Sequence, residues 1–278
     1  MNNVKLIAVQ LVSSPSIEEN LVAIDEQLQA IRKQYPSGDI LAVLPECCLM
    51  FATKDSEVRQ FSEHKGEGPM QEALSELSKK YQLYIVAGTI AIKAEDGRHF
   101  AASLLFDSQG NELGQYNKIH LFDVDVSDGY GSYRESENTH PGQHISVVET
   151  PIGNIGMAVC YDLRFGAFFN EMRTLGAEIL VLPSAFTHAT GHAHWELLCR
   201  ARAVENQCYM VASNQGGLHK NGRETWGQSM VVDPWGTIES QIASGEGYAV
   251  GEFDRDKLAA IRQKMPMASQ QRFESRLK

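Results

Sequence analysis

Two continuous apolar runs that each end on Leu-Pro constrain the fold of this chain most strongly. Residues 39–46 read D-I-L-A-V-L-P-E, and residues 178–186 read E-I-L-V-L-P-S-A-F. Unbroken apolar runs of this length are typical of strands that are buried on both faces of a parallel sheet. A strand-like run precedes each of them, at 5–12 and at 152–160, with a helical pattern in between. The repeated order predicts two β-α-β units.

Two similar β/α units in a chain of 278 residues predict two sheets packed face to face with helices outside them. We therefore expect an α/β protein with a four-layer α-β-β-α sandwich. Residues 102–107 and 113–120 flank a turn and predict an antiparallel hairpin, so the sheet is mixed rather than wholly parallel. No linker rich in Gly, Ser or Pro divides the sequence, and residues 1–278 are expected to form one domain.

The remaining elements are predicted from apolar periodicity and from cap and turn residues. Ser16 and Glu19 form a capping-box pattern at the start of the first helix. Residues 122–142 are polar and without period, which indicates a functional loop. Further helices are expected at 70–81, 166–175, 192–206 and 254–264, further strands at 84–92, 145–149, 208–213, 230–234 and 247–253, and an extended polar tail after them.

Composition and charge exclude several classes of partner and location. The chain is 43% hydrophobic and 22% charged, with a formal net charge of −10, which argues against nucleic acid or an anionic membrane as a partner. Its five cysteines are odd in number and include no C-x-x-C pair, so a reducing compartment is expected. We find no signal-peptide pattern and no apolar run of transmembrane length, and the default location is the cytoplasm.

Three reactive side chains fall at equivalent places, because Glu46, Lys118 and Cys160 each lie at or near the end of a predicted strand. Taken singly, each has a plainer interpretation: a solvated strand tip for the first two and a buried structural thiol for Cys160. Together they make a coherent set, in which a carboxylate serves a thiol nucleophile as base and an ammonium stabilises the thiolate and then an oxyanion. The start of the helix that follows Cys160 would also favour the thiolate.

Three segments resemble the catalytic motifs of the nitrilase (carbon–nitrogen hydrolase) superfamily: L-P-E at 44–46, N-K-I-H-L-F-D at 117–123 and C-Y-D-L-R-F at 160–165. The resemblance implies an α-β-β-α sandwich with Glu46 as general base and acid, Lys118 as electrostatic stabiliser and Cys160 as nucleophile. It also implies a second glutamate in the preceding loop, for which Glu135 matches better than Glu137. A homodimer or higher homo-oligomer is the implied assembly, built across the helices near Cys160 and at 194–206.

The same resemblance implies a thiol-dependent amidase that cleaves a small linear amide through a thioester and releases ammonia. The segments at 190–209 and 227–236 look most like amidases that act on deaminated glutathione. An ω-amidase acting on 2-oxoglutaramate, an N-carbamoyl amidohydrolase, a nitrilase and a catalytically silent binding protein of the same fold are the alternatives.

Substrate-binding residues are less well defined by the sequence. The backbone N–H of Tyr161, next to the nucleophile, is the expected second oxyanion donor, while its side chain could equally pack. A substrate carboxylate calls for a cation, and Arg164 is the expected one, with Arg134 and Arg173 as alternatives. Two expected pocket walls follow a predicted strand, and these are Phe186 and Thr187.

The turn after the nucleophile reads R-F-G-A, where relatives often have R-F-P-E, which leaves the start of the next helix and an ion pair there in doubt. His188, His192 and His194 cluster, but Gly191 interrupts their spacing, and helix packing is the favoured interpretation over a zinc site. No phosphate-binding glycine motif occurs. We therefore expect no metal, nucleotide or organic cofactor.

Overall fold

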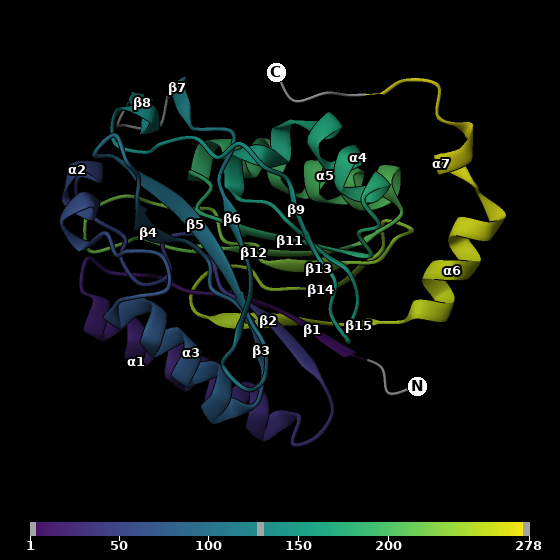
Figure 1. Ribbon diagram of the computed structural model, residues 1–278, viewed down its shortest axis with the longest axis horizontal. Coiled ribbons are helices and arrows are strands. Elements are labelled where there is room, and N and C mark those ends of the chain that lie inside the picture. The colour runs from purple at the N-terminus through teal and green to yellow at the C-terminus, as the bar shows by residue number, and fades with distance from the viewer. Residues whose placement is uncertain (1–3, 127–130, 275–278) are drawn as a thin grey trace.

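Two mixed β-sheets lie face to face between helices in the computed structural model, which describes residues 4–126 and 131–274. Figure 1 shows the four layers, with α1 and α3 on one side of the sheets and α4 and α5 on the other. The predicted α-β-β-α sandwich is confirmed.

The first sheet has the strand order β15-β1-β2-β3-β5-β4, with β6 paired to β5. Its centre, β1 to β3, is parallel, and its edges are antiparallel. Its strands are β1 (Val4–Gln10), β2 (Ile40–Val43), β3 (Tyr84–Val86), β4 (Ile90–Lys93), β5 (His99–Phe106), β6 (Glu112–Asn117) and β15 (Gly247–Phe253).

The second sheet has the order β14-β13-β12-β11-β10-β9, again with a parallel centre, from β10 to β12. Its strands are β9 (Ser146–Val148), β10 (Ile155–Met157), β11 (Ile179–Ser184), β12 (Tyr209–Asn214), β13 (Met230–Val232) and β14 (Ile238–Gln241). Both parallel centres end on loops that carry candidate site residues, because Glu46 follows β2 and Cys160 follows β10.

Alternation along the central strands explains their unbroken hydrophobicity. In β1, Leu6 and Ala8 face the second sheet, while Ile7 and Val9 join the core beneath the helices α1 (Ile17–Gln34) and α3 (Pro69–Tyr81). The outer face of the second sheet is covered by α4 (Gly166–Thr174) and α5 (His188–Asn206). Both faces of each sheet are therefore covered with apolar side chains, as the Leu-Pro runs predict.

The first helix starts as its cap pattern predicts, with Ser16 as the N-cap and its Oγ accepting the Glu19 N–H at 3.3 Å. The Glu19 carboxylate does not return that bond. It accepts from the Ser14 hydroxyl at 2.6 Å and from Lys220. The helix start is thus tied to the loop that carries Lys220.

The predicted single strand at 84–92 is wrong, since it is divided into β3 and β4, which pair with successive parts of β5. The break contains Gly88, whose φ of +38° places the position of a Cβ 2.0 Å from the Pro45 carbonyl oxygen. Only glycine fits so close to the neighbouring turn. The break brings Thr89 up to the turn that carries Glu46.

Helix α5 begins at His188 and not at His192 as predicted, with the Thr187 hydroxyl as its N-cap. Gly191 lies inside the helix because Trp226 packs against it, leaving 2.2 Å between the position of a Cβ and the Trp226 Cβ. Gly191, which the sequence indicates as an interruption, is thus explained by its close contact with Trp226.

The segment at 122–142 is more ordered than the predicted loop. It contains the hairpin of β7 (Asp123–Asp125) and β8 (Ser132–Arg134) and a 3₁₀ turn at Glu135–Glu137, while residues 127–130 lie outside the described residues. The sequence also gives no sign of β14, and the expected extended tail contains α7 (Met267–Gln270) after α6 (Arg255–Lys264). A short helix, α2 (Asp55–Val58), precedes α3.

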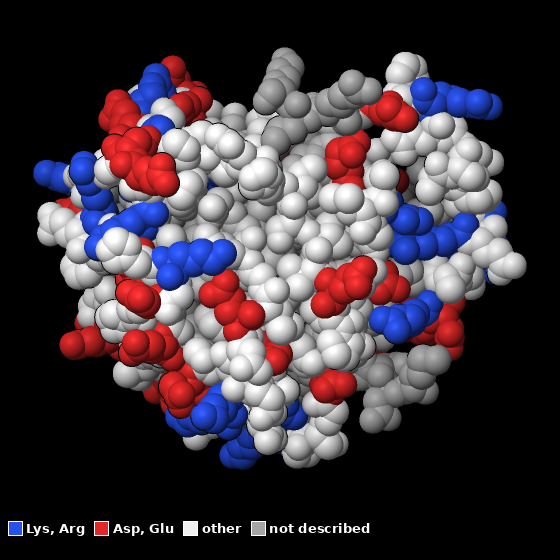
Figure 2. Space-filling view, in the orientation of Figure 1, with Lys and Arg blue, Asp and Glu red and all other residues white. Residues whose placement is uncertain are grey.

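Surface charge is mixed on the face seen in Figure 2, where Lys and Arg side chains alternate with Asp and Glu around a largely uncharged centre. No continuous basic surface is visible on that face. Within residues 4–126 and 131–274, no helix combines the length and the apolarity that crossing a bilayer requires.

Candidate active site

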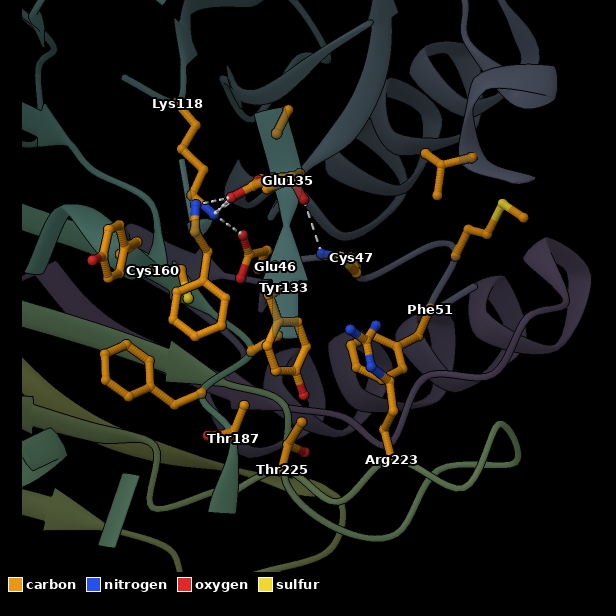
Figure 3. Close-up of a pocket in the computed structure, with 18 of the residues that line it drawn as sticks. Glu46, Cys47, Phe51, Lys118, Tyr133, Glu135, Cys160, Thr187, Arg223 and Thr225 are labelled. Carbon is orange, nitrogen blue, oxygen red and sulfur yellow. Dashed lines mark hydrogen bonds and ion pairs between the residues drawn. The ribbon is translucent and has the colours of Figure 1, made fainter. Parts of the chain in front are cut away.

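Glu46, Lys118, Glu135 and Cys160 line one cavity, and we refer to them as the inner cluster. They come from four separate segments: the turn after β2, the end of β6, the 3₁₀ turn after β8 and the turn after β10. Figure 3 shows the Lys118 ammonium beside both carboxylates, with the Cys160 sulfur next to Glu46.

The Lys118 ammonium is paired with two carboxylates at once. Its Nζ lies 2.8 Å from Glu46 Oε1 and 3.0 and 2.9 Å from the two Glu135 oxygens, and the lysine side chain is only 2% exposed. Burial alone lowers the pKa of Lys118, but the charges of Glu135 and Glu46 outweigh it and raise the pKa well above its usual range. The lysine is therefore a fixed positive charge.

Glu135 is held from a second side, because the Phe122 backbone N–H donates to its Oε2 at 2.6 Å. Burial and the neighbouring Glu46 raise the pKa of Glu135, while Lys118 opposes that shift. Glu137 lies on the same 3₁₀ turn but is not among the described residues that line the cavity.

Cys160 has a φ of +47°, which is unusual for a residue with a side chain, and it opens the 3₁₀ helix Cys160–Arg164. Residues other than glycine that adopt the left-handed backbone conformation are enriched at functional sites. Burial raises the pKa of the Cys160 thiol well above its usual range, and Glu46 adds to this more than Lys118 offsets. Both effects favour the neutral thiol over the thiolate at Cys160, whose sulfur lies next to Glu46 in Figure 3.

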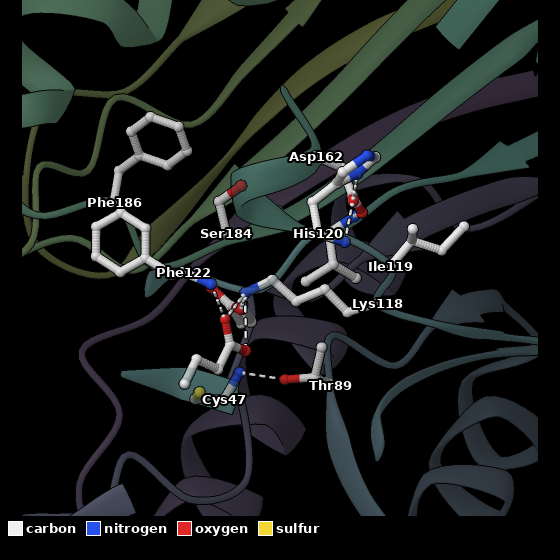
Figure 4. Close-up of polar contacts among 12 residues, drawn as sticks. Cys47, Thr89, Lys118, Ile119, His120, Phe122, Asp162, Ser184 and Phe186 are labelled. Carbon is white, nitrogen blue, oxygen red and sulfur yellow. Dashed lines mark hydrogen bonds and ion pairs between the residues drawn. The ribbon is translucent and has the colours of Figure 1, made fainter. Parts of the chain in front are cut away.

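The turn that carries Glu46 is fixed on both sides. Cys47 has a φ of +57°, and its N–H donates to the Thr89 hydroxyl at 2.9 Å (Figure 4). On the other side, the Gln215 side chain donates to the Glu46 carbonyl at 3.0 Å. Neither Thr89 nor Gln215 is indicated by a sequence motif, because both act through folding contacts between distant segments.

Asp162 links the lysine segment to the cysteine turn and was missed among the candidate residues. It is fully buried and accepts the Tyr116 hydroxyl at 2.8 Å, the Val159 N–H at 2.8 Å and both the N–H and the Nδ1 of His120, at 3.2 and 2.7 Å (Figure 4). Of these three partners, His120 lies two residues after Lys118 and Val159 lies directly before Cys160. Both Asp162 and His120 lie inside the motif segments, which is the signal that could have found them.

The cavity has a volume of about 520 Å³, within the range of roughly 300–1,000 Å³ that suits small-molecule ligands. All four predicted substrate-binding residues line it: Tyr161, Arg164, Phe186 and Thr187. The Arg164 guanidinium stacks over the rings of Phe186 and Tyr161, at 5.3 and 5.8 Å from their centroids.

The alternative cations lie elsewhere. Arg134 pairs with Asp125 in its own hairpin, and Arg173 on α4 is partly buried next to the charge of Arg262. Neither is among the described residues that line the cavity.

A further set of cavity residues, the outer cluster, was not predicted and comprises Phe51, Tyr133, His219 and Arg223. The Arg223 guanidinium lies over the rings of Phe51 and Tyr133, at 5.4 and 5.3 Å, and the His219 ring packs on Phe51 at 4.1 Å. Phe51, Tyr133 and Arg223 line the cavity directly. Phe51, His219 and Arg223 come from loops without period or motif, and Tyr133 comes from the short strand β8, which the sequence does not predict.

The three clustered histidines serve packing and one polar contact. The rings of His188 and His192 lie edge-on to Trp226, and His194 Nδ1 lies 3.1 Å from an Arg164 nitrogen. Across the described ranges, 4–126 and 131–274, no three His, Cys, Asp or Glu side chains group as metal ligands.

All five cysteines lie in the described residues and none forms a disulfide. Burial raises the pKa of Cys48 to about 12 and that of Cys208 to about 11, which makes both unreactive at neutral pH. Cys199 lies on the buried face of α5.

The chain is similar to known proteins in both sequence and structure. The sequence pattern of the carbon–nitrogen hydrolase family matches residues 5–263. The deaminated glutathione amidase of Yersinia enterocolitica is 42% identical over 279 residues, covering 100% of this chain and 96% of that protein. The omega-amidase NIT2 of Xenopus tropicalis is 34% identical, covering 98% and 96%. Saccharomyces cerevisiae Nit3, described as a member of the nitrilase superfamily, superposes with a TM-score of 0.87 at 30% identity, covering 98% and 97%.

Proposed function

Because the chain belongs to the carbon–nitrogen hydrolase family and is an enzyme acting on non-peptide C–N bonds, we propose that its substrate is deaminated glutathione. One observation carries the catalytic part of this proposal: a thiol, a carboxylate next to it and a lysine paired with that carboxylate line one cavity. The relatives named deaminated glutathione amidase support the choice of substrate.

In the first half of the proposed reaction, the Cys160 sulfur attacks the amide carbonyl carbon while Glu46 accepts the thiol proton. This order follows from the raised pKa of Cys160, because a resting thiol needs a base during attack. Lys118 and the Tyr161 backbone N–H stabilise the oxyanion. Glu46 then gives its proton to the departing nitrogen, the C–N bond breaks and a thioester remains on Cys160.

In the second half, water attacks the thioester carbonyl while Glu46 accepts a water proton. The C–S bond breaks, the acid product leaves, and the Cys160 sulfur recovers its proton from Glu46. Glu135 holds Lys118 in place through both halves, since both of its oxygens contact the ammonium. One carboxyl group thus alternates between base and acid.

The leaving group depends on the substrate. In deaminated glutathione the amide nitrogen belongs to cysteine, so the products are 2-oxoglutarate and cysteinylglycine. Ammonia, the product that the sequence resemblance suggests, leaves only when the substrate is 2-oxoglutaramate. Since one relative is named an omega-amidase, 2-oxoglutaramate is the second candidate substrate.

We also propose that the enzyme works as a homodimer in the cytoplasm. Large apolar side chains are exposed on and just after the helices over the second sheet, Leu175 at 58%, Leu197 at 68% and Val204 at 44%. A second copy would cover this surface. The absence of disulfides among the five cysteines is consistent with a reducing compartment.

The test measures 2-oxoglutarate formed from deaminated glutathione and from 2-oxoglutaramate, with cysteinylglycine and ammonia measured separately. Cys160→Ala should abolish turnover of both, and acid-quenched wild-type protein should carry the acyl group on Cys160. Cys199→Ala removes another buried thiol outside the cavity and should keep its activity. Turnover that survives in Cys160→Ala would overturn the mechanism, and turnover of 2-oxoglutaramate alone would replace the proposed substrate.

A further inference from the structure

Two arginines line the cavity. Of the described residues that line it, the arginines are Arg164, four residues after the nucleophile, and Arg223, on the loop between β12 and β13. In Figure 3, Arg223 lies across the cavity from Cys160, with the Tyr133 ring between them.

A run of aromatic rings connects the two guanidinium groups along the cavity wall. From Arg223, the distances between successive groups are 5.3 Å to Tyr133, then 5.1 Å from Tyr133 to Phe122 and 5.1 Å from Phe122 to Tyr161. Tyr161 lies 5.8 Å from the Arg164 guanidinium. A ligand that follows this wall would meet a cation at both ends and apolar surface between them.

Packing holds the Arg223 guanidinium in one orientation. It lies over both Phe51 and Tyr133, and stacking of this kind fixes the plane of an arginine so that its N–H groups form a directed fork. The loop beneath it is anchored as well, because the buried His219 contacts the Ser13 carbonyl at 2.8 Å and the Thr225 hydroxyl at 2.7 Å. A fixed fork of this type suits a carboxylate.

Deaminated glutathione has a carboxylate at each end, on opposite sides of the amide that is cleaved. The acyl carboxylate is the nearer one, and the carboxylate of the cysteinylglycine part lies farther from the scissile carbonyl, at the end of a dipeptide that spans roughly 7 Å when extended. Arg164, beside the nucleophile, matches the nearer carboxylate. Arg223, across the cavity, matches the farther one.

Resting on the proposed function, we propose that Arg223 binds the terminal carboxylate of the leaving dipeptide and so selects a peptide-like leaving group over ammonia. The inferred ligand class is an amide whose nitrogen carries a short chain ending in a carboxylate. 2-Oxoglutaramate has no such group and would leave Arg223 unused.

The experiment compares kcat/KM of wild type and Arg223→Met on both substrates and on deaminated glutathione with its terminal carboxylate amidated. We expect Arg223→Met to lower kcat/KM on deaminated glutathione by about 10- to 100-fold, as expected for a lost charge-assisted hydrogen bond, and to leave 2-oxoglutaramate turnover within about twofold. Amidation should slow the wild type by a similar factor and have little further effect on the variant.

Two further variants serve as references. Lys220→Met removes the same charge from the same loop, but Lys220 pairs with Glu19 at the surface, and all three rates should stay unchanged. Arg223→Lys keeps the charge without the planar fork and should recover only part of the lost rate. Activity on 2-oxoglutaramate reports directly whether each variant is folded.

Equal losses on both substrates in Arg223→Met, or no loss on either, would overturn the inference. The inference would also be overturned if amidation of the substrate lowered kcat/KM by the same factor in the wild type and in Arg223→Met. A wild type that hydrolyses only 2-oxoglutaramate would overturn the inference but keep the amidase mechanism. A wild type that hydrolyses neither would overturn the proposed function itself, and the two failures are thus distinguishable.

Discussion

The inner and outer clusters of the cavity are built in different ways. In the inner cluster, a lysine that is 2% exposed is bound by two carboxylates at 2.8 to 3.0 Å, and each group comes from the end of a strand or an adjoining turn. In the outer cluster, Arg223 on a loop and Tyr133 on the short strand β8 are half-buried and meet through ring stacking at 5.3 Å.

This difference separates chemistry from selection. Charges that are buried and mutually satisfied cost several kcal/mol to disturb, so changes in the inner cluster should affect every substrate. Stacked groups near solvent are individually weaker, and changes in the outer cluster should affect substrates selectively. Each prediction below either strengthens this contrast or breaks it.

The largest effect is expected for Lys118→Met. It removes the proposed oxyanion donor and leaves Glu46 and Glu135 facing each other without a counter-charge. Loss of one such donor lowers kcat by about 10²- to 10³-fold, and breaking a buried pair lowers the free energy of unfolding by about 3–5 kcal/mol. Steady-state kinetics and urea unfolding at neutral pH measure both.

The matched reference is Lys80→Met, which removes a lysine of the surface pair with Asp25, where the lysine side chain is 54% exposed. Its free energy of unfolding should stay close to that of the wild type, because exposed ion pairs contribute little, and kcat should not change. If Lys118→Met kept near-normal activity on either substrate, the inner cluster would not form a catalytic unit.

A smaller effect is expected for Asp162→Asn. An amide in place of the carboxylate has only one oxygen for donors that now use two, so a nitrogen must face the N–H of either Val159 or His120. The turn of Cys160 and the segment of Lys118 should lose their mutual alignment. We expect kcat to fall about 10- to 100-fold on both substrates with KM nearly unchanged.

Tyr116→Phe removes a single donor to Asp162 and should lower kcat by only a few-fold. A rise in KM with normal kcat in Asp162→Asn would contradict this positioning role. A loss confined to deaminated glutathione would assign Asp162 to selection instead and break the contrast between the two clusters.

The sequence predicts the inner end of the cavity far better than the outer end, and the reason is physical. Glu46, Lys118 and Cys160 follow strands, whose periodic apolar patterns predict where they end and therefore which residues meet at the sheet edge. Phe51 and Arg223 lie on loops, and Tyr133 lies on the short hairpin strand β8, and the paths of these segments depend on contacts between distant parts of the chain. Contacts between distant segments produce no local pattern in the sequence.

The same limit applies to the fold. The layers follow from alternation and from the Leu-Pro runs, but the break between β3 and β4 depends on the approach of Gly88 to Pro45. Likewise, the early start of α5 depends on Gly191 meeting Trp226. In each case a glycine that locally indicates an interruption is explained only by the residue packed against it.

Glu46→Gln tests the electrostatics inside the inner cluster. Burial is the main cause of the raised pKa of Cys160, and the charge of Glu46 is the next. Removing the Glu46 charge should therefore lower the pKa of Cys160, because Lys118 still favours the thiolate. Alkylation by the neutral reagent iodoacetamide requires the thiolate. The rate of alkylation at Cys160, followed by peptide mass spectrometry, should therefore begin to rise at a lower pH in the variant than in the wild type. The variant itself should no longer turn over substrate. A shift toward higher pH would show that Glu46 stabilises the thiolate.

The smallest effect is expected in the outer cluster, where His219 is buried beside Phe51. Burial is the main cause that lowers the pKa of His219, and the charge of Arg223 adds to it. The unfolded chain therefore binds more protons at this site than the folded one once pH falls below about 6.5. The stability that the neutral ring provides is present above that pH and is lost as pH falls through it.

His219→Asn should remove this dependence, because its amide can still donate to the Ser13 carbonyl but does not titrate. The variant should be less stable at neutral pH by about 1–2 kcal/mol, through the lost bond to the Thr225 hydroxyl. Urea unfolding between pH 7.5 and 5.5 should then show the difference from wild type narrowing as pH falls. A difference that stayed constant with pH would contradict this role of the neutral His219 ring.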